Sequence, residues 1–379
     1  MGDRRRKWLK RGGLALASTL FSLLLAEGAL SVLGIGDPVL RDVDPVLGWA
    51  PIAGAEGWWT REGRGHVVIT EHGFRGVLVP EGKPPGTLRV VVLGDSYTEA
   101  RQVALEDSFG VRLEAGLNTC HDAPVEVLAF GVSGYGTAQQ RVLLEHRVWD
   151  FDPDVVIVAF LTGNDVADNH PALRVSGDPA PYYVFENGAL VLDDSFTESE
   201  DFRRRTEGGW SRDLRRRSRL VRMVSGLGRT RRHHAGRGEL GLRDEIYDPT
   251  PSGDWEEAWA RTDAILAAMN RDVTARGARF GVVTLSNAVQ VDPDPAVREA
   301  FRARLGVPDL EAPDRRIRSF GEREGFEVLT LVPILRAHAE EHDVQLHGFE
   351  NTEMGAGHWN EAGHRVAANA MSEWLCDNL

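Results

Sequence analysis

A run of six mostly apolar residues, Leu88–Leu93, ends abruptly at Gly94-Asp95-Ser96. Its length and its β-branched residues are typical of a strand buried on both faces of a parallel sheet. In open α/β sheets ligands bind at the carboxyl ends of the strands, where loops diverge and helices begin. Ser96 is therefore a candidate nucleophile. The alternative is that Asp95 or Ser96 only caps the following helix.

The chain holds four further strand-like runs, separated by amphipathic helical patterns. These runs are Val125–Phe130, Val155–Leu161, Phe280–Leu285 and Phe326–Leu331. Helical patterns follow Ser96, begin at about Thr137, and cover Asp254–Ala275 and Arg315–Glu324. Alternating strands and helices predict a parallel sheet covered by helices on both faces.

Three of the later loops carry residues suited to a site at the same sheet edge. Gly131–Thr137 is rich in glycine, which lets backbone N–H groups approach a ligand, although it could be an ordinary strand-to-helix turn. Asn164 follows the third strand in Gly163-Asn164-Asp165, a sequence that also forms simple turns. His358 lies in a loop after the last strand. A zinc pair with His364 is a poor alternative, because residues six apart do not share a helical face.

Taken in order, these four blocks resemble the SGNH hydrolases, also called GDSL-like esterases and lipases. The matching residues are GDS at 94–96, GVSGYG at 131–136, GND at 163–165 and HWNEAGH at 358–364. The resemblance implies a three-layer α/β/α sandwich with a five-stranded, mostly parallel, flavodoxin-like sheet. It further implies that Ser96 is the nucleophile and His358 the general base. The oxyanion hole would combine the Ser96 and Gly134 N–H groups, with Gly131 as a substitute for Gly134, and the Asn164 side chain.

One position departs from the family pattern. The family places an aspartate three residues before the histidine, and here that residue is Gly355. The site could work as a Ser-His dyad, a backbone carbonyl could accept the imidazole proton, or Glu353 or Glu350 could substitute. Loss of the orienting acid lowers turnover in related chemistry. Asp95 and Asp165 are expected to support the turn and the Asn164 loop.

The N-terminus is typical of a membrane signal. Six Lys and Arg residues in 1–11 precede an uncharged run from Gly12 to Ala26, and Glu27 is the only charge before Asp37. The run to Ile35 is long enough to cross a bilayer, and no convincing cleavage site follows it. We therefore expect an uncleaved signal-anchor with the rest of the chain outside the cytoplasm, in the periplasm or at the cell surface.

This organisation predicts three regions. Residues 1–36 form a basic cytoplasmic tail and an anchor helix, and 37–85, rich in Gly, Pro and Trp, form an irregular leader packed on the main domain. Residues 86–379 form the hydrolase-like domain, with an arginine-rich insertion at about 170–253. Within it, Ser211–Leu227 could be a basic helix resting on anionic headgroups or packed on the acidic body.

Composition narrows the functional classes. The net charge is −13, and the positive charge is concentrated in the N-terminal tail and the insertion. The remaining acidic body argues against nucleic-acid binding. No cofactor and no metal are expected. In the strand order implied by the resemblance, the helices ending at Cys120 and Cys376 cover one sheet face, so these two cysteines could form a disulfide in an oxidising compartment.

The favoured function is a serine esterase that removes O-acyl groups, with O-acetyl groups on envelope or exported glycans as the expected substrates. The substrate is then an acylated small molecule or glycan. The first alternative is an O-acyltransferase that acts on an extracytoplasmic polysaccharide. The second is a weakly catalytic glycan-binding or assembly component, motivated by Gly355.

Overall fold

The computed structural model describes residues 2–33, 36–174, 176–226 and 243–378. Contacts between residues divide the chain into two units. One combines residues 1–39 with 204–237, and the other combines 40–203 with 238–379. The second unit holds the sheet and all predicted site residues. Part of the arginine-rich insertion, residues 227–242, lies outside the described residues.

The core of the larger unit is a five-stranded sheet in the order β11-β10-β7-β5-β6. Its strands are β5 (Leu88–Gly94), β6 (Val125–Gly131), β7 (Val155–Leu161), β10 (Arg279–Leu285) and β11 (Glu327–Thr330). Every pair in this sheet is parallel. The five predicted strands are therefore confirmed, in the flavodoxin-like order, with β5 and β7 paired at the centre. Ligand crevices in such sheets form beside this point, where the strand order reverses.

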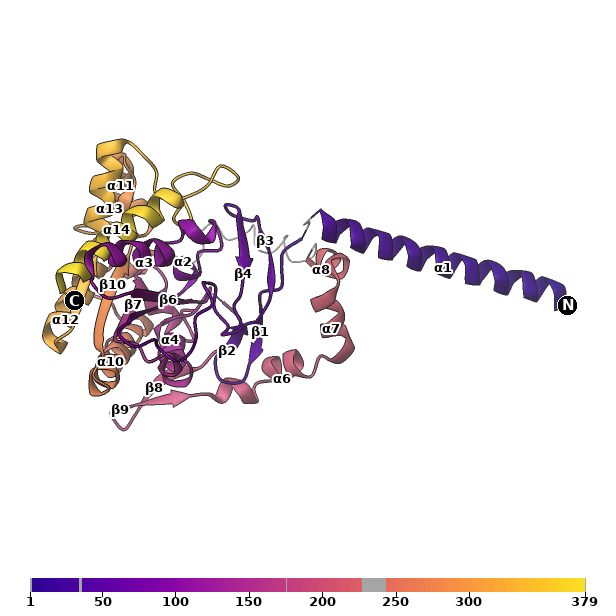
Figure 1. Ribbon diagram of the computed structural model, residues 1–379, viewed down its shortest axis with the longest axis horizontal. Helices are drawn as coiled ribbons and strands as arrows, with labels where there is room; N and C mark the ends of the chain where they lie inside the picture. Colours follow the sequence, from indigo (N-terminus) through magenta and orange to yellow (C-terminus); the bar gives the residue numbers. More distant parts are fainter. Residues whose placement is uncertain (1, 34–35, 175, 227–242, 379) are drawn as a thin grey trace. The chain divides into compact units, whose positions relative to one another are not determined.

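Helices cover both faces of the sheet, giving three layers (Figure 1). One face packs against α3 (Phe109–Cys120), α13 (Val332–His342) and α14 (Glu361–Asn378). The other packs against α4 (Thr137–His146), α10 (Asp254–Ala275) and α12 (Ala312–Glu324). Strand side chains alternate between two separate apolar clusters, which is why these strands are apolar along their whole length.

The remaining elements of the larger unit are short or belong to connections. The α-helices are α2 (Ser96–Glu99), α5 (Asp165–Asp168), α11 (Pro295–Leu305) and, at the boundary of the two units, α6 (Glu200–Thr206). A hairpin, β8 (Tyr182–Glu186) and β9 (Ala189–Asp193), opens the insertion. The 3-10 turns are η1 (Leu105–Asp107), η2 (Val148–Phe151), η3 (Ser195–Glu198), η4 (Asp244–Tyr247) and η5 (Ala288–Val291).

The leader is more regular than the sequence predicted. It folds into two antiparallel hairpins, β1 (Arg41–Asp44) with β2 (Gly48–Pro51) and β3 (Glu56–Trp59) with β4 (Gly65–Val68). Each strand has four residues, too few to show a clear alternation of apolar and polar residues. The buried Arg75 guanidinium fixes the leader to the main domain by donating to the carbonyl oxygens of Glu99 and Val103. Burial lowers the pKa of Arg75 to about 10, so it stays charged at neutral pH.

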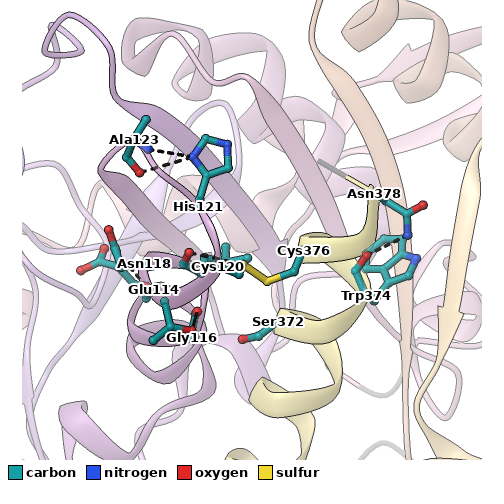
Figure 2. The surroundings of a disulfide bond; sticks show 12 residues. Glu114, Gly116, Asn118, Cys120, His121, Ala123, Ser372, Trp374, Cys376 and Asn378 are labelled. Carbon is teal, nitrogen blue, oxygen red and sulfur yellow. Dashed lines mark hydrogen bonds between the residues drawn. A yellow bond between two sulfur atoms is a disulfide. The ribbon is translucent and has the colours of Figure 1, made fainter.

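A disulfide joins the ends of the two helices that the sequence analysis singled out. Cys120 ends α3, and Cys376 lies near the end of α14, with 6.0 Å between their Cα atoms (Figure 2). The two helices pack side by side on one face of the sheet. The bond closes a loop of 256 residues.

The smaller unit contains α1 (Gly2–Val32), α7 (Gly209–Arg217) and α8 (Arg219–Gly226). The segment Arg6–Val32 of α1 is long and apolar enough to cross a membrane. The single basic helix expected over Ser211–Leu227 is instead two helices that meet at Ser218. The interruption occurs where Ser218 and the first N–H groups of α8 bind the Glu27 carboxylate, a long-range contact that no local pattern reveals.

Candidate active site

Ser96 follows the carboxyl end of strand β5 and is the first residue of helix α2. Asp95 caps α2 by accepting the Tyr97 N–H at 2.9 Å. The helix ends after one turn at Ala100, whose φ of 51° is left-handed. This tight turn places the serine between the loops that follow β6 and β7, because β5 pairs with both strands.

Hydrogen bonds to its backbone groups hold the loop that carries His358. Asn360 caps α14 by accepting the N–H groups of Ala362 and Gly363. The His358 carbonyl accepts the Gly348 N–H at 2.9 Å. The Gly357 carbonyl accepts bonds from the Tyr97 hydroxyl at 3.1 Å and the His347 ring at 2.7 Å. These hydrogen bonds fix the position of the His358 backbone, from which the imidazole extends.

The imidazole of His358 joins the serine to a carboxylate. Its Nε2 lies 2.7 Å from Ser96 Oγ, and its Nδ1 lies 2.6 Å from an oxygen of Glu62. An ionised carboxylate only accepts hydrogen bonds, so Nδ1 carries the proton and Nε2 accepts the serine hydroxyl. This is the tautomer that a general base requires.

Glu62 was not among the predicted site residues, and it supplies the acid that Gly355 does not. Its second oxygen accepts the backbone N–H of His358 at 2.7 Å, so the carboxylate contacts this residue twice. Burial raises the pKa of Glu62, but the hydrogen bonds and charge of His358 outweigh that effect and hold the pKa below its ordinary value. The predicted substitutes, Glu350 and Glu353, are exposed, and Glu62 takes the place proposed for them.

Two glycines allow the leader to reach the imidazole. Gly63 has a φ of +63°, and a Cβ there would lie 2.2 Å from the Gln102 carbonyl oxygen. Gly357 has a φ of +81°, and a Cβ there would lie 2.2 Å from the Glu62 carboxylate. Asn351 secures the loop, accepting the Gly63 N–H and donating to the carbonyls of Thr60 and Gly63.

No local signal identifies Glu62 in the sequence. It is 296 residues away from His358, between two short strands, in a segment without apolar periodicity. The only local hint of such a contact is Gly357, directly before His358, because the absence of a side chain there leaves room for a group from another segment. That indication does not say which group arrives.

The loops expected to stabilise an oxyanion adjoin Ser96. Gly131 pairs with Gly94, and the Val132 N–H donates to the Gly94 carbonyl at 3.1 Å. Next to Gly134, the backbone N–H and hydroxyl of Ser133 both donate to Glu99 of α2. Asn164 donates its amide to Asp95 at 3.2 Å. These two loops thus meet at residues 94–99.

Asp95 and Asp165 form a buried acidic pair beneath these loops. Asp165 accepts the Leu161 N–H at 2.8 Å, which ties the Asn164 turn to the end of β7. Burial raises the pKa of Asp95, and burial together with the charge of Asp95 raises that of Asp165 further. Each of the two carboxylates accepts a backbone N–H at its turn.

The other two histidines of this region do not face the serine. His347 is buried, with its Nε2 3.0 Å from Ser286 Oγ, which in turn accepts the Trp359 indole N–H. Burial lowers its pKa to about 4, so it stays neutral and supports the Gly357 carbonyl. His364 accepts the Phe109 N–H at 3.3 Å. No group of three or more potential metal-ligating residues occurs in the described part of the chain.

A cavity of about 450 Å³ lies at the opposite edge of the sheet. It is lined by residues at the starts of β7, β10 and β11 and by the end of α14, including Val155, Arg279, Glu327 and Trp374. Catalytic residues in this fold lie at the carboxyl ends of the strands. We therefore do not assign this cavity to the substrate.

The comparisons with known proteins give structural neighbours only. No protein-family model matches the chain, and no curated protein matches it. LAE5, an alpha/beta hydrolase enzyme from the metagenome of Lake Arreo, Spain, is 14% identical, covers 76% of this chain and 96% of its own, and has a TM-score of 0.40. The acetyl xylan esterase AlAXEase is 13% identical over 76% of this chain and 100% of its own, with a TM-score of 0.39.

A third neighbour is the lipase/acylhydrolase from Enterococcus faecalis. It is 11% identical, covers 77% of this chain and 97% of its own, and has a TM-score of 0.38. At these identities and TM-scores the neighbours carry no argument about this chain, and its activity has to be argued from its own side chains.

Proposed function

We propose that this chain is a serine ester hydrolase of the SGNH type. The observation that carries the proposal is the continuous chain of hydrogen bonds from Ser96 through His358 to Glu62. A serine hydroxyl is a weak nucleophile unless a base accepts its proton, and an oriented imidazole is suited to that near neutral pH. The glycine-rich loop and Asn164 beside Ser96 are suited to stabilise the resulting oxyanion.

The reaction follows from these positions. Ser96 Oγ attacks the ester carbonyl carbon while its proton moves to His358 Nε2, and Glu62 stabilises the imidazolium through Nδ1. The Ser96 and Gly134 N–H groups and the Asn164 amide stabilise the negative oxygen. The intermediate then expels the alcohol, which takes the proton from His358. Water attacks the acyl-enzyme with His358 as base and releases the carboxylic acid.

We further propose that the substrates are small O-acyl esters, with O-acetyl groups on glycans outside the cytoplasm as the preferred class. The apolar part of α1 and the positive charges in its first turns support an anchor that leaves the larger unit outside the cytoplasm. The acyltransferase alternative uses the same acyl-enzyme with a sugar hydroxyl in place of water. The weakly catalytic alternative loses its motive, because Glu62 provides the acid that Gly355 lacks.

The test is hydrolysis of 4-nitrophenyl acetate and of O-acetylated oligosaccharides by the full chain, measured as released nitrophenol and acetate. The Ser96→Ala variant should lose turnover and labelling by a fluorophosphonate. The matched variant Ser319→Ala, at an exposed position of α12, should keep both. Acetate transfer to an added glycan without net acetate release would favour the transferase. Full activity of Ser96→Ala would overturn the proposal.

A further inference from the structure

The smaller unit contains a charge in an unusual place. Glu27 lies sixteen residues beyond Arg11 in α1, or about 24 Å along a helix that rises 1.5 Å per residue. The hydrocarbon core of a bilayer is about 30 Å thick. A membrane-spanning α1 would therefore hold this carboxylate near the far boundary of the hydrocarbon, where an uncompensated charge is costly.

The structure compensates this charge with the start of α8. The Glu27 carboxylate accepts the Ser218 hydroxyl at 2.7 Å, the Arg219 N–H at 2.6 Å and the Leu220 N–H at 3.0 Å. These are the first N–H groups of a helix, which lack partners within it and carry partial positive charge. If α1 spans the membrane, these hydrogen bonds hold the first turn of α8 at the depth where α1 leaves the hydrocarbon.

The two helices tied to this level have the composition of an interfacial surface. Trp210 of α7 is 79% exposed and Val224 of α8 is 62% exposed, with Leu214 and Met223 also exposed. The same two helices carry several arginines, among them Arg216, Arg217, Arg219 and Arg222. Exposed apolar side chains interspersed with arginine are typical of helices that lie at the boundary between headgroups and acyl chains.

We propose that α7 and α8 lie in the headgroup layer of an anionic lipid bilayer, on the side where α1 leaves the membrane. This inference rests on the membrane anchor in the proposed function and is independent of the catalytic step. The apolar side chains would enter the acyl boundary, and the arginines would contact lipid phosphates. The charge of the arginines and the continuity with α1 favour a lipid surface over a protein partner.

The test uses single thiols in the full chain, reconstituted in nanodiscs. Because Cys120 and Cys376 form a disulfide, a new cysteine is the only reactive thiol. A fluorophore is attached at Leu20→Cys in α1, at Val224→Cys in α8, or at Glu322→Cys, an exposed position of α12. Lipids with a nitroxide in the headgroup or deep in the acyl chain then quench it according to depth.

With anionic lipid in the discs, we expect headgroup nitroxide to quench the label at 224 several-fold more than that at 322. This difference should shrink in neutral discs and in the variant Arg216→Gln/Arg217→Gln. Equal quenching at 224 and 322, or equal quenching at 224 in neutral and anionic discs, would overturn the inference. The label at position 20 reports separately on the anchor, through deep nitroxide, and esterase activity reports on the catalytic proposal.

Discussion

In the proposed mechanism the Asn164 amide has two tasks. One N–H donates to Asp95 at 3.2 Å, and the second would stabilise the oxyanion that develops beside Ser96. We predict that Asn164→Ala lowers kcat by about 10²- to 10³-fold, because one fixed donor in an oxyanion hole is worth about 3 to 4 kcal/mol. KM should change little, since the interaction strengthens only in the transition state. Steady-state kinetics on 4-nitrophenyl acetate measures both.

The matched control is Asn118→Ala, which removes a side chain that bonds backbone groups of Glu114 and Val125 away from the site. It should leave kcat unchanged. A kcat within threefold of wild type for Asn164→Ala would remove this residue from the oxyanion hole.

The sequence predicts the site residues that directly follow strands of the main sheet. It does not predict Glu62, which lies in the leader. Ser96, Asn164 and the Gly131–Gly136 loop each follow a strand whose apolar run is visible, so their convergence follows from parallel pairing. His358 is different, because helix α13 separates it from the last strand and it reaches Ser96 through the loop before α14. Glu62 depends on a contact across 296 residues, which no pattern in a single sequence contains.

Among the elements, long helices and buried strands were predicted well, and short or contact-dependent ones were not. Helix α10 covers the predicted Asp254–Ala275, because its apolar residues recur over six turns. The leader hairpins have four-residue strands, and the α7–α8 break depends on Glu27. Local sequence pattern does not predict the secondary structure where contact with a distant residue determines the backbone conformation.

The connection between β3 and β4 carries Glu62, so its position affects the orientation of His358. Asn351 clamps it through three hydrogen bonds to the backbone of Thr60 and Gly63, next to Glu62. We predict that Asn351→Ala lowers kcat by about tenfold or more, because small misplacements of a catalytic group are costly. The unfolding midpoint should change little, since Asn351 is itself exposed.

Asn270→Ala is the control for this prediction. It removes a hydrogen bond from Asn270 to the Glu324 carbonyl, which joins α10 to the end of α12 beside the opposite edge of the sheet. Its kcat should equal that of wild type. If both variants have wild-type kcat, the clamp does not position the acid.

At the scale of the whole molecule, a buried carboxyl makes stability depend on pH. Burial raises the pKa of Asp314 to about 7, although Gln290 donates to it at 3.0 Å. The folded state keeps this proton up to about pH 7, whereas the unfolded chain releases it near its ordinary value of 3.8. Stability is therefore lost as the pH rises through that window.

Asp314→Asn should remove this loss. We predict that it raises the free energy of unfolding at pH 8, relative to wild type, by on the order of 1 to 3 kcal/mol more than at pH 4. Urea unfolding at the two pH values measures this. Asp309→Asn is the control: Arg315 lowers the pKa of Asp309, so this variant should show no such gain at pH 8. An equal effect of Asp314→Asn at both pH values would contradict the prediction.

The proposed activity depends most on the relay in which an acid from the leader orients His358. Its most direct measurement is the rate constant for modification of Ser96 by a fluorophosphonate in the full chain, followed by intact mass. Glu62→Gln should lower this rate by about 10³- to 10⁴-fold, because the amide favours the wrong imidazole tautomer, whereas Glu353→Gln should leave it unchanged. A wild-type rate in Glu62→Gln would contradict the account.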